Sequence, residues 1–209
     1  MRNIVMVGSG GHAICVLDIL EDSGFELSEV VSEKEWASSV RDRIRPRIVG
    51  GFEKLAQIYH KTSHAVIAIG GNLEREASFR KMECNKFIFP PILSNFASIS
   101  NYSLIGCGAV VMPNSRIGPD SKVGKLCIIN TNSVVEHECV VGDFVHISPG
   151  AILCGRVSVG NRTWIGAGAV IRDGVSIGEN CMIGAGASVT MNVPDNSTYV
   201  GVPAKPIKR

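Results

Sequence analysis

The most chemically suggestive residue of the chain is His137, which lies between Glu136 and Glu138. Histidine titrates near neutral pH, so it can take a proton from an attacking amine or hydroxyl group. A neighbouring carboxylate fixes the imidazole tautomer and stabilises the imidazolium that forms. The three residues therefore indicate a general base, and the alternative is an ordinary solvated histidine on a surface turn.

These residues lie within a six-residue repeat that fills the second half of the chain. Every sixth residue from Leu93 to Val189 is Ile, Leu or Val, and the residue four positions after each of them is small. An α-helix of period 3.6 cannot keep a six-residue repeat on one face. The period is that of a parallel β-helix with one hexapeptide per flat side, in which Gly and Asn at the turns allow unusual backbone angles.

The repeat predicts which residues are neighbours in space. Three sides per coil give eighteen residues per turn, so residues i and i+18 lie about 4.8 Å apart on successive coils. His137 and Gly155 are related in this way. His137 occupies the third place of its hexapeptide, so we expect it at a corner, pointing outward.

A metal site is a competing use of the same stretch, because Cys139 lies two positions after His137. The repeat sends Cys139 inward and His137 outward, so the two cannot share one ligand sphere. A zinc site built from histidines needs three of them, and only His137 and His146 follow Leu93. We expect no metal.

The first part of the chain alternates strand-like and helix-like segments, which predicts a small Rossmann-like parallel α/β sheet. Pro90 and Pro91 mark its end, so we predict one domain over 1–90 and another over 91–209. The basic stretch that starts at Arg41 is expected to be a solvated loop. Strands are expected at 3–8, 25–32 and 64–70, and helices at 12–24, 51–60 and 72–83.

The segment GSGGHA, residues 8–13, follows the first expected strand and opens the first helix. Its glycine-rich backbone and helix N-terminus are suited to a pyrophosphate, with His12 as a hydrogen-bond donor to phosphate or sugar. The segment also fits a loose dinucleotide pattern with Glu33 as the acidic residue about 20 positions on. A nicotinamide cofactor is disfavoured because nothing downstream resembles a hydride-transfer domain.

Composition excludes several other classes of protein. The net charge is +2 and the basic residues are scattered, so a nucleic-acid-binding face is not expected. No apolar stretch approaches the roughly 20 residues needed to span a bilayer. The seven cysteines are odd in number and lack paired spacing. They are expected to be reduced small hydrophobes in a cytoplasmic protein.

The chain resembles the bacterial sugar O- and N-acetyltransferases, which are trimeric left-handed β-helix enzymes that use acetyl-CoA. The group includes the sialic acid O-acetyltransferases and the nucleotide-linked amino-sugar N-acetyltransferases of glycan and surface polysaccharide synthesis. The likeness covers essentially the full chain. It rests on GSGGHA from Gly8, IAIGGNLER from Ile67, INTNSVVEHECVVGDFVHISPGAILCG from Ile129 and VGVPAK from Val200.

The resemblance implies a role for particular residues. His137 would be the general base, Glu138 its orienting carboxylate and Gly155 the backbone donor to the thioester oxygen, while His146 would lie near the acceptor sugar or the cofactor thiol. The family often has an Asp pair after the second strand, where this chain has Ser32 and Glu33. The expected nucleotide-sugar residues are Gly8, Ser9, Gly10, Gly11, His12, Glu33, Gly70 and Asn72. The expected acetyl-CoA residues are His146, Gly155, Ala167, Ala185, Gly186, Gly201, Pro203 and Lys205.

The predicted activity is acetyl transfer from acetyl-CoA to the amino group of a nucleotide-linked amino sugar, of the 4-amino-4,6-dideoxy type, by direct attack in a ternary complex. The alternative within the same class is O-acetylation of a sugar hydroxyl. A third interpretation is a non-catalytic nucleotide-sugar-binding protein, which the joint presence of His137, Glu138 and Gly155 disfavours.

Overall fold

The computed structural model describes residues 1–33, 47–83 and 86–207. The chain forms two compact units, Met1–Asn95 and Phe96–Arg209, and each is described by itself. Among the described residues, no helix is both long and apolar enough to cross a membrane.

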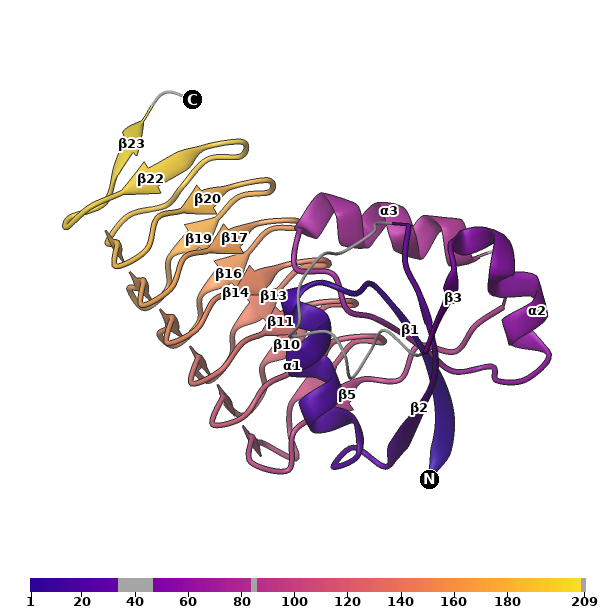
Figure 1. Ribbon diagram of the computed structural model, residues 1–209. Helices are drawn as coiled ribbons and strands as arrows, with labels where there is room; N and C mark the ends of the chain where they lie inside the picture. The colour runs from indigo at the N-terminus through magenta and orange to yellow at the C-terminus, as the bar shows by residue number, and fades with distance from the viewer. Residues whose placement is uncertain (34–46, 84–85, 208–209) are drawn as a thin grey trace. The chain divides into compact units, whose positions relative to one another are not determined.

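The N-terminal unit is a parallel sheet with helices, in the strand order β3–β2–β1–β4 (Figure 1). β1 is fully buried from Ile4 to Met6 because both faces of the sheet are covered, which explains its unbroken apolar run. The elements are β1 (Arg2–Val7), α1 (Gly11–Leu20), β2 (Phe25–Val31), β3 (Ile48–Gly50), the 3-10 helix η3 (Phe52–Lys54), α2 (Leu55–Tyr59), β4 (Ala65–Ile67), α3 (Asn72–Glu83) and β5 (Ile92–Leu93).

The prediction of an α/β domain is confirmed, and one of its local details is wrong. Ile48–Gly50, inside the basic stretch taken for a solvated loop, forms β3 and pairs with β2. Residues 41–46 of that stretch lie outside the described residues. The helix expected over 51–60 is a 3-10 turn followed by the five-residue α2. An edge strand of three residues is too short to give a periodic signal, so the sequence did not reveal it.

The C-terminal unit is a parallel β-helix, seen in Figure 1 as a stack of coils running from magenta to yellow. Each coil contributes two-residue strands, and partners in adjacent coils are eighteen residues apart, as in Val134 beside Ile152. The strands are β6 (Ser98–Ile99), β7 (Leu104–Ile105), β8 (Val110–Val111), β9 (Arg116–Ile117), β10 (Lys122–Val123), β11 (Ile128–Ile129), β12 (Val134–Val135), β13 (Val140–Val141), β14 (His146–Ile147), β15 (Ile152–Leu153), β16 (Ser158–Val159), β17 (Trp164–Ile165), β18 (Val170–Ile171), β19 (Ser176–Ile177), β20 (Met182–Ile183), β21 (Ser188–Val189), β22 (Thr198–Val200) and β23 (Lys205–Ile207).

The described strands of this unit form three flat sides, named here by their first strands. The β6 sheet contains β6, β9, β12, β15, β18 and β21; the β7 sheet contains β7, β10, β13, β16 and β19; and the β8 sheet contains β8, β11, β14, β17, β20, β22 and β23. Each coil passes from the β6 sheet to the β7 sheet, then to the β8 sheet, and back. The turns between them make three corner columns, which we call the β6/β7, β7/β8 and β8/β6 corners.

The interior is filled by the two columns that the repeat predicted. The second residue of each strand points inward, and Ile117, Ile129 and Val135 are completely buried. The small residue two positions before it is buried as well, as at Ser121 and Cys127. This packing explains why the large aliphatic and the small residue recur with the same six-residue period.

The prediction that Gly and Asn supply the unusual angles of the turns is confirmed at some turns, such as Gly108 and Asn132, and wrong at others. From Gly108 to Gly186, the fourth residue of every hexapeptide has a positive φ. Several of these positions hold side chains that rarely adopt this region: Asp120, Leu126, Glu138, Phe144, Arg156 and Arg162. A corner carbonyl one coil earlier accepts the backbone N–H of five of them: Leu126, Glu138, Phe144, Arg156 and Arg162; the bond from Glu138 to Pro119 is 2.9 Å long. The bond between coils offsets the backbone cost.

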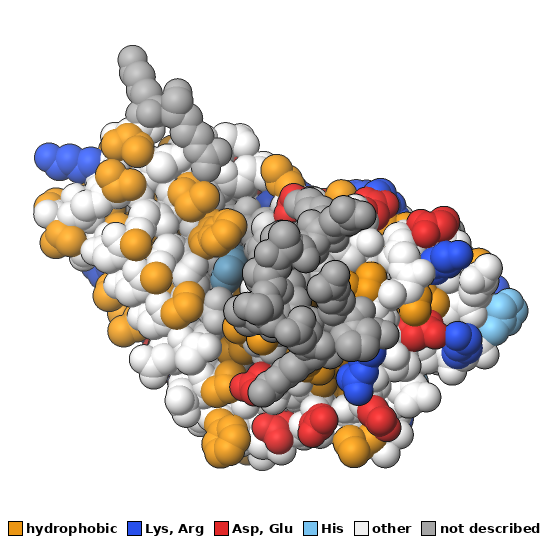
Figure 2. Space-filling model, viewed as in Figure 1, with side chains coloured by type: hydrophobic (Ala, Val, Ile, Leu, Met, Phe, Trp, Pro, Cys, Tyr) orange, Lys and Arg blue, Asp and Glu red, His pale blue; other side chains and the backbone are white. Residues whose placement is uncertain are grey.

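The repeat ends before the chain does. Met182 pairs with Thr198, sixteen residues on, and β23 returns antiparallel to β22. On the viewed face, Figure 2 shows charged side chains gathered mainly on the N-terminal unit, while hydrophobic side chains outnumber charged ones on the β-helix.

Candidate active site

His137 and Glu138 lie at the β6/β7 corner, in the turn between β12 and β13. In an extended strand, adjacent side chains point to opposite faces. Here the positive φ of Glu138 (58°) turns the chain, and the two side chains meet, with His137 Nδ1 3.0 Å from Glu138 Oε2. When Nδ1–H donates to this carboxylate, the lone pair of Nε2 is left to accept a proton. The side chains of both residues are about half exposed.

Gly155 stands directly beside the imidazole on the next coil. The adjacent Arg156 donates its backbone N–H to the His137 carbonyl at 2.9 Å. A Cβ placed on Gly155 would lie 2.5 Å from both Nε2 and Cε1 of His137. Only glycine leaves the ring in this position, and within the described part of the chain the Gly155 N–H has no acceptor.

Two further charged residues, which were not predicted from the sequence, complete this cluster. Arg156 lies one coil from Glu138, with Nη1 3.9 Å from Oε2, and its Nη2 donates to Asp173 Oδ2 at 2.7 Å. Asp173 is one coil beyond Gly155. The eighteen-residue register, applied to Glu138 and Gly155, would have found both.

Cys139 is kept out of this chemistry. Its side chain is fully buried and its thiol donates to the Cys154 carbonyl at 3.1 Å. Burial raises the pKa of the Cys139 thiol to about 11, so it remains protonated at neutral pH.

His146 lies on a different side of the β-helix, at the outward position of β14 in the β8 sheet. Its Nε2 is 3.0 Å from Asn130 Nδ2, and its ring stacks on Trp164 with centroids 4.6 Å apart. It is only 7% exposed. Within one chain His146 is therefore separated from the His137 corner.

Apart from His146 and Gly155, the residues expected to bind acetyl-CoA lie at the β8/β6 corner or in the tail that follows it. Ala167 and Ala185 occupy equivalent turns on successive coils, and the Gly186 N–H donates to the Ala167 carbonyl at 2.8 Å. Gly201 continues the column after β22, where its carbonyl accepts from the Ser188 N–H at 3.0 Å. Pro203 and Lys205 follow in the tail that forms β23. One chain thus has two separate groups of predicted residues, at the two edges of the β6 sheet.

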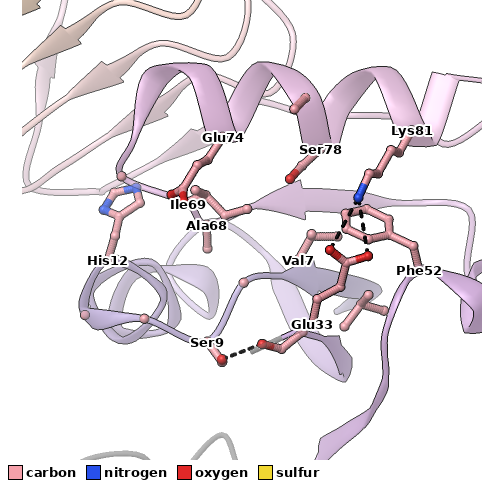
Figure 3. Close-up of a pocket in the computed structure, with 17 residues that line it drawn as sticks. Val7, Ser9, His12, Glu33, Phe52, Ala68, Ile69, Glu74, Ser78 and Lys81 are labelled. Carbon is pink, nitrogen blue, oxygen red and sulfur yellow. Dashed lines mark hydrogen bonds and ion pairs between the residues drawn. The ribbon is translucent and has the colours of Figure 1, made fainter. Parts of the chain in front are cut away.

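A cavity of about 450 Å³ lies in the N-terminal unit at the carboxyl ends of β1, β2 and β4 (Figure 3). It is built by the loop after β1, whose Gly8 has φ 108° and approaches the backbone closely. A Cβ there would lie 2.8 Å from the Ala68 carbonyl oxygen. The lining includes the predicted Gly8, Ser9, Gly10, Gly11, His12, Glu33 and Gly70.

Asn72 is absent from this lining. Its carboxamide Oδ1 accepts from Arg75 Nη2 at 2.8 Å, and Arg75 also donates to the carbonyls of Ile69 at 3.0 Å and Gly70 at 2.9 Å. Arg75 is only 1% exposed. This buried arginine therefore shapes the loop that closes one side of the cavity.

His12 begins α1 beside this loop. Its Nε2 is buried and has no hydrogen-bond partner among the described residues. Burial, and secondly the nearby positive charge of Arg75, lower the pKa of His12 to about 4. The imidazole is therefore neutral at pH 7, and it can offer a ligand one N–H donor and one acceptor but no charge.

The opposite end of the cavity holds charged groups from two elements. Glu33 accepts from Lys81 Nζ, which is 3.3 Å from both carboxylate oxygens, and the same ammonium lies 4.6 Å from the centre of the Phe52 ring. Ser9 and Ser32 share a hydrogen bond of 2.7 Å. Figure 3 shows the Glu33–Lys81 pair beside Phe52, with Ser9 on the first loop. Four lining residues were not predicted from the sequence, because their elements carry no sequence sign of facing the first loop: Phe52, Glu74, Ser78 and Lys81.

The chain matches two protein families. Residues 3–82 match the PglD N-terminal domain, and residues 156–190 match the bacterial transferase hexapeptide (six repeats). No curated protein sequence matches the chain.

Solved structures with a similar fold cover nearly the whole chain. One is a mutant of perosamine N-acetyltransferase from Caulobacter crescentus in complex with CoA and GDP-perosamine, with 32% identity, coverage of 100% of this chain and 98% of that chain, and a TM-score of 0.94. A second is the acetyltransferase domain of PglB from Neisseria gonorrhoeae with acetyl coenzyme A, with 30% identity, 99% coverage of each chain and a TM-score of 0.90. A third is WeeI from Acinetobacter baumannii, with 26% identity, coverage of 99% and 100%, and a TM-score of 0.87.

The sequence of this chain is 32% and 30% identical to the first two proteins over nearly its full length. Its structure has a histidine–carboxylate pair at a corner of the β-helix and a glycine-rich cavity in the N-terminal unit, as the resemblance to sugar acetyltransferases implies. This chain belongs to the bacterial hexapeptide-repeat sugar acetyltransferases that carry a PglD-type N-terminal domain.

Proposed function

We propose that this protein transfers an acetyl group from acetyl-CoA to the amino group of a nucleotide-linked amino sugar of the 4-amino-4,6-dideoxy type, in the synthesis of a bacterial glycan or surface polysaccharide. One observation carries the proposal: His137, paired with Glu138 at 3.0 Å, faces Gly155 in a chain 32% identical over its full length to an N-acetyltransferase crystallised with CoA and GDP-perosamine. Because acetyl-CoA is made and used in the cytoplasm, we also propose that the enzyme works there.

In the proposed reaction the neutral amine attacks the thioester carbonyl directly. The new N–C bond forms while the carbonyl oxygen becomes an oxyanion that the Gly155 N–H stabilises. His137 Nε2 removes the proton from the attacking nitrogen, and Glu138 stabilises the resulting imidazolium. The C–S bond then breaks, CoA leaves as a thiolate, and the imidazolium returns the proton to it. No covalent enzyme intermediate is needed.

The N-terminal cavity is proposed to hold the nucleotide. The Gly10–Gly11 backbone at the start of α1 would receive a phosphate through N–H groups and the positive end of the helix dipole. Neutral His12 would supply a hydrogen bond rather than a charge. At the other end, Glu33 and Lys81 would contact the base or ribose.

We propose that the active enzyme is a homotrimer with each site shared by two copies. The support is the separation of the predicted residues: His137 and Gly155 occupy the β6/β7 corner, whereas Ala167 and Ala185 occupy the β8/β6 corner. Both corners border the β6 sheet. If this sheet faces a threefold axis, the first corner of one copy meets the second corner of the next.

Mixed trimers test the shared site. We expect His137→Ala, which lacks the base, and Ala185→Trp, which fills the cofactor corner, to be inactive alone. Co-expressed in equal amounts, they should regain about a quarter of wild-type activity, because about one site in four combines two intact corners. Absence of complementation in verified mixed trimers would place both corners of a site in the same copy.

The function is tested by CoA release from acetyl-CoA with UDP-, dTDP-, GDP- and CMP-linked sugars, in matched amino and hydroxy forms. We expect turnover with a 4-amino sugar nucleotide, reduced about 100-fold or more in His137→Ala. Turnover with hydroxy sugars alone would change the assignment to O-acetylation. Binding of a nucleotide sugar without any CoA release would refute catalysis and leave a binding protein.

A further inference from the structure

Arg156 and Asp173 extend the His137–Glu138 pair into a chain of charged groups across two coils. Glu138 Oε2 lies 3.0 Å from His137 Nδ1 and 3.9 Å from Arg156 Nη1. Arg156 Nη2 in turn donates to Asp173 Oδ2 at 2.7 Å. One oxygen of Glu138 therefore faces both the proposed base and a guanidinium, which limits the rotation of its carboxylate.

Asp173 is placed where a negative charge is unfavourable for acetyl transfer. A Cβ on Gly155 would lie 2.9 Å from Asp173 Oδ1, on the same residue whose N–H faces the thioester oxygen in the proposed reaction. An oxyanion that develops beside an uncompensated carboxylate is destabilised. The Arg156 guanidinium pairs with this carboxylate and supplies the opposing charge.

We propose that Arg156 is a positioning residue for acetyl transfer, which holds Glu138 against His137 and offsets the charge of Asp173 beside the Gly155 N–H. The inference rests on the proposed function and deepens it. Arg156 acts through Glu138 and Asp173 and does not itself contact the reacting atoms. The backbone fixes its location, because Arg156 has φ 59° and its N–H donates to the His137 carbonyl at 2.9 Å.

Kinetics of four variants test the charge balance. Arg156→Met is expected to lower kcat about 10- to 100-fold with little change in the KM for either substrate. The reason is that the lost interactions stabilise the transition state rather than the bound substrates. Arg156→Lys should recover most of this loss. Replacing Asp173 by Asn in the Arg156→Met background should restore at least part of kcat, because the uncompensated carboxylate is gone, whereas Asp173→Asn alone should have a smaller effect than Arg156→Met.

Arg162 provides a matched control. It occupies the same turn position one hexapeptide later, has φ 60°, and pairs with Glu179 at 2.7 Å at the β7/β8 corner, away from His137. Arg162→Met should leave kcat unchanged. Equal losses in the two methionine variants, or no recovery on removal of the Asp173 charge, would overturn the charge-balancing role.

The imidazole spectrum of His137 tests the positioning role without turnover. Nitrogen-15 NMR, with the resonance assigned by its loss in His137→Gln, should find the Nδ1–H tautomer dominant in the wild type and in Arg162→Met. In Arg156→Met, we expect exchange between the two tautomers as Glu138 moves. If Arg156→Met showed this tautomer exchange but the wild type released no CoA, the proposed function would be refuted and the positioning role of Arg156 would be supported. An unchanged spectrum in Arg156→Met would overturn the positioning.

Discussion

At the scale of single residues, the close approach of Gly155 to His137 defines the proposed catalytic corner. The space beside the imidazole is too small for a methyl group, since Nε2 and Cε1 both lie 2.5 Å from a Cβ at position 155. The ring is at the end of a half-exposed side chain, so it can rotate away rather than strain the backbone. A larger residue at 155 should therefore damage catalysis more than folding.

Gly155→Ala tests this distinction. The added methyl group is expected to displace the His137 ring and to lower kcat roughly 100-fold, the usual weight of a general base. The free energy of unfolding should fall by only about 1 kcal/mol. Steady-state kinetics and urea denaturation measure the two effects. A variant that kept wild-type kcat would mean that the ring position does not matter for the reaction.

His12 makes the stability of the N-terminal unit depend on pH. Its pKa is lowered from 6.5 to about 4 in the folded protein, by burial and by Arg75. Protonation therefore favours the unfolded chain. The stabilising contribution of the neutral imidazole is complete above about pH 6.5 and is lost as the pH falls toward 4.

His12→Gln should remove this pH dependence. Between about pH 6.5 and pH 4, the wild type should lose on the order of 1–3 kcal/mol more unfolding free energy than the variant does. Urea denaturation near both ends of that range measures the difference. Parallel stability curves for the two proteins would contradict a lowered pKa at His12.

At the scale of elements, side chains at the β7/β8 corner bind the coils together. Asp143 Oδ1 accepts from the Lys125 N–H at 2.9 Å, and Asn161 Oδ1 accepts from the Asp143 N–H at 2.7 Å. Asn161 Nδ2 then donates to Glu179 at 3.0 Å. Two-residue strands provide few hydrogen bonds per coil, so each corner bond matters more than it would in a long strand.

Asn161→Ala should therefore weaken the β-helix. The change leaves the Asp143 N–H without its acceptor and removes the donor to Glu179, at an expected cost of about 1–2 kcal/mol in unfolding free energy. Ser176→Ala, on the outward side of β19, is the control and should change stability by less than about 0.5 kcal/mol. Equal effects of the two substitutions in urea denaturation would show that the corner bonds add nothing.

At the scale of the whole molecule, the β6 sheet is the surface that the proposed trimer requires. Its outward row contains Val134, Ile152 and Val170 in three successive coils, and Val170 is 39% exposed. A contiguous apolar row is suited to burial between copies. The same sheet separates the two corners that must come together.

Val170→Arg should dissociate the trimer. The three arginines of a trimer would lie close together at the threefold axis and repel one another. Sedimentation velocity is therefore expected to detect monomers, and CoA release should be lost at the same time. Ser176→Arg places the same charge on the β7 sheet and should preserve both assembly and activity. Retention of the trimer by Val170→Arg would exclude the β6 sheet from the axis.

The sequence by itself determined the parts of this protein that follow from a strict period. Eighteen-residue register made His137 and Gly155 neighbours, because every coil has the same length and every large aliphatic residue must point inward. The sequence also predicted the first glycine-rich loop, because a buried strand followed by GSGGHA favours a tight turn into a helix. In the structure this loop lines the cavity.

Only the tertiary structure decided what depends on contacts between distant segments. The short strand β3 exists because β2 offers it an edge. Glu138 and Arg156 adopt positive φ because hydrogen bonds between coils outweigh their own backbone preference. Lys81 reaches Glu33 from a helix that carries no sequence sign of facing the cavity. The separation of His137 from His146, which lies in the β8 sheet, and from Ala167, which lies at another corner, is likewise a property of the closed coil, because residues close in sequence are distributed over three sides.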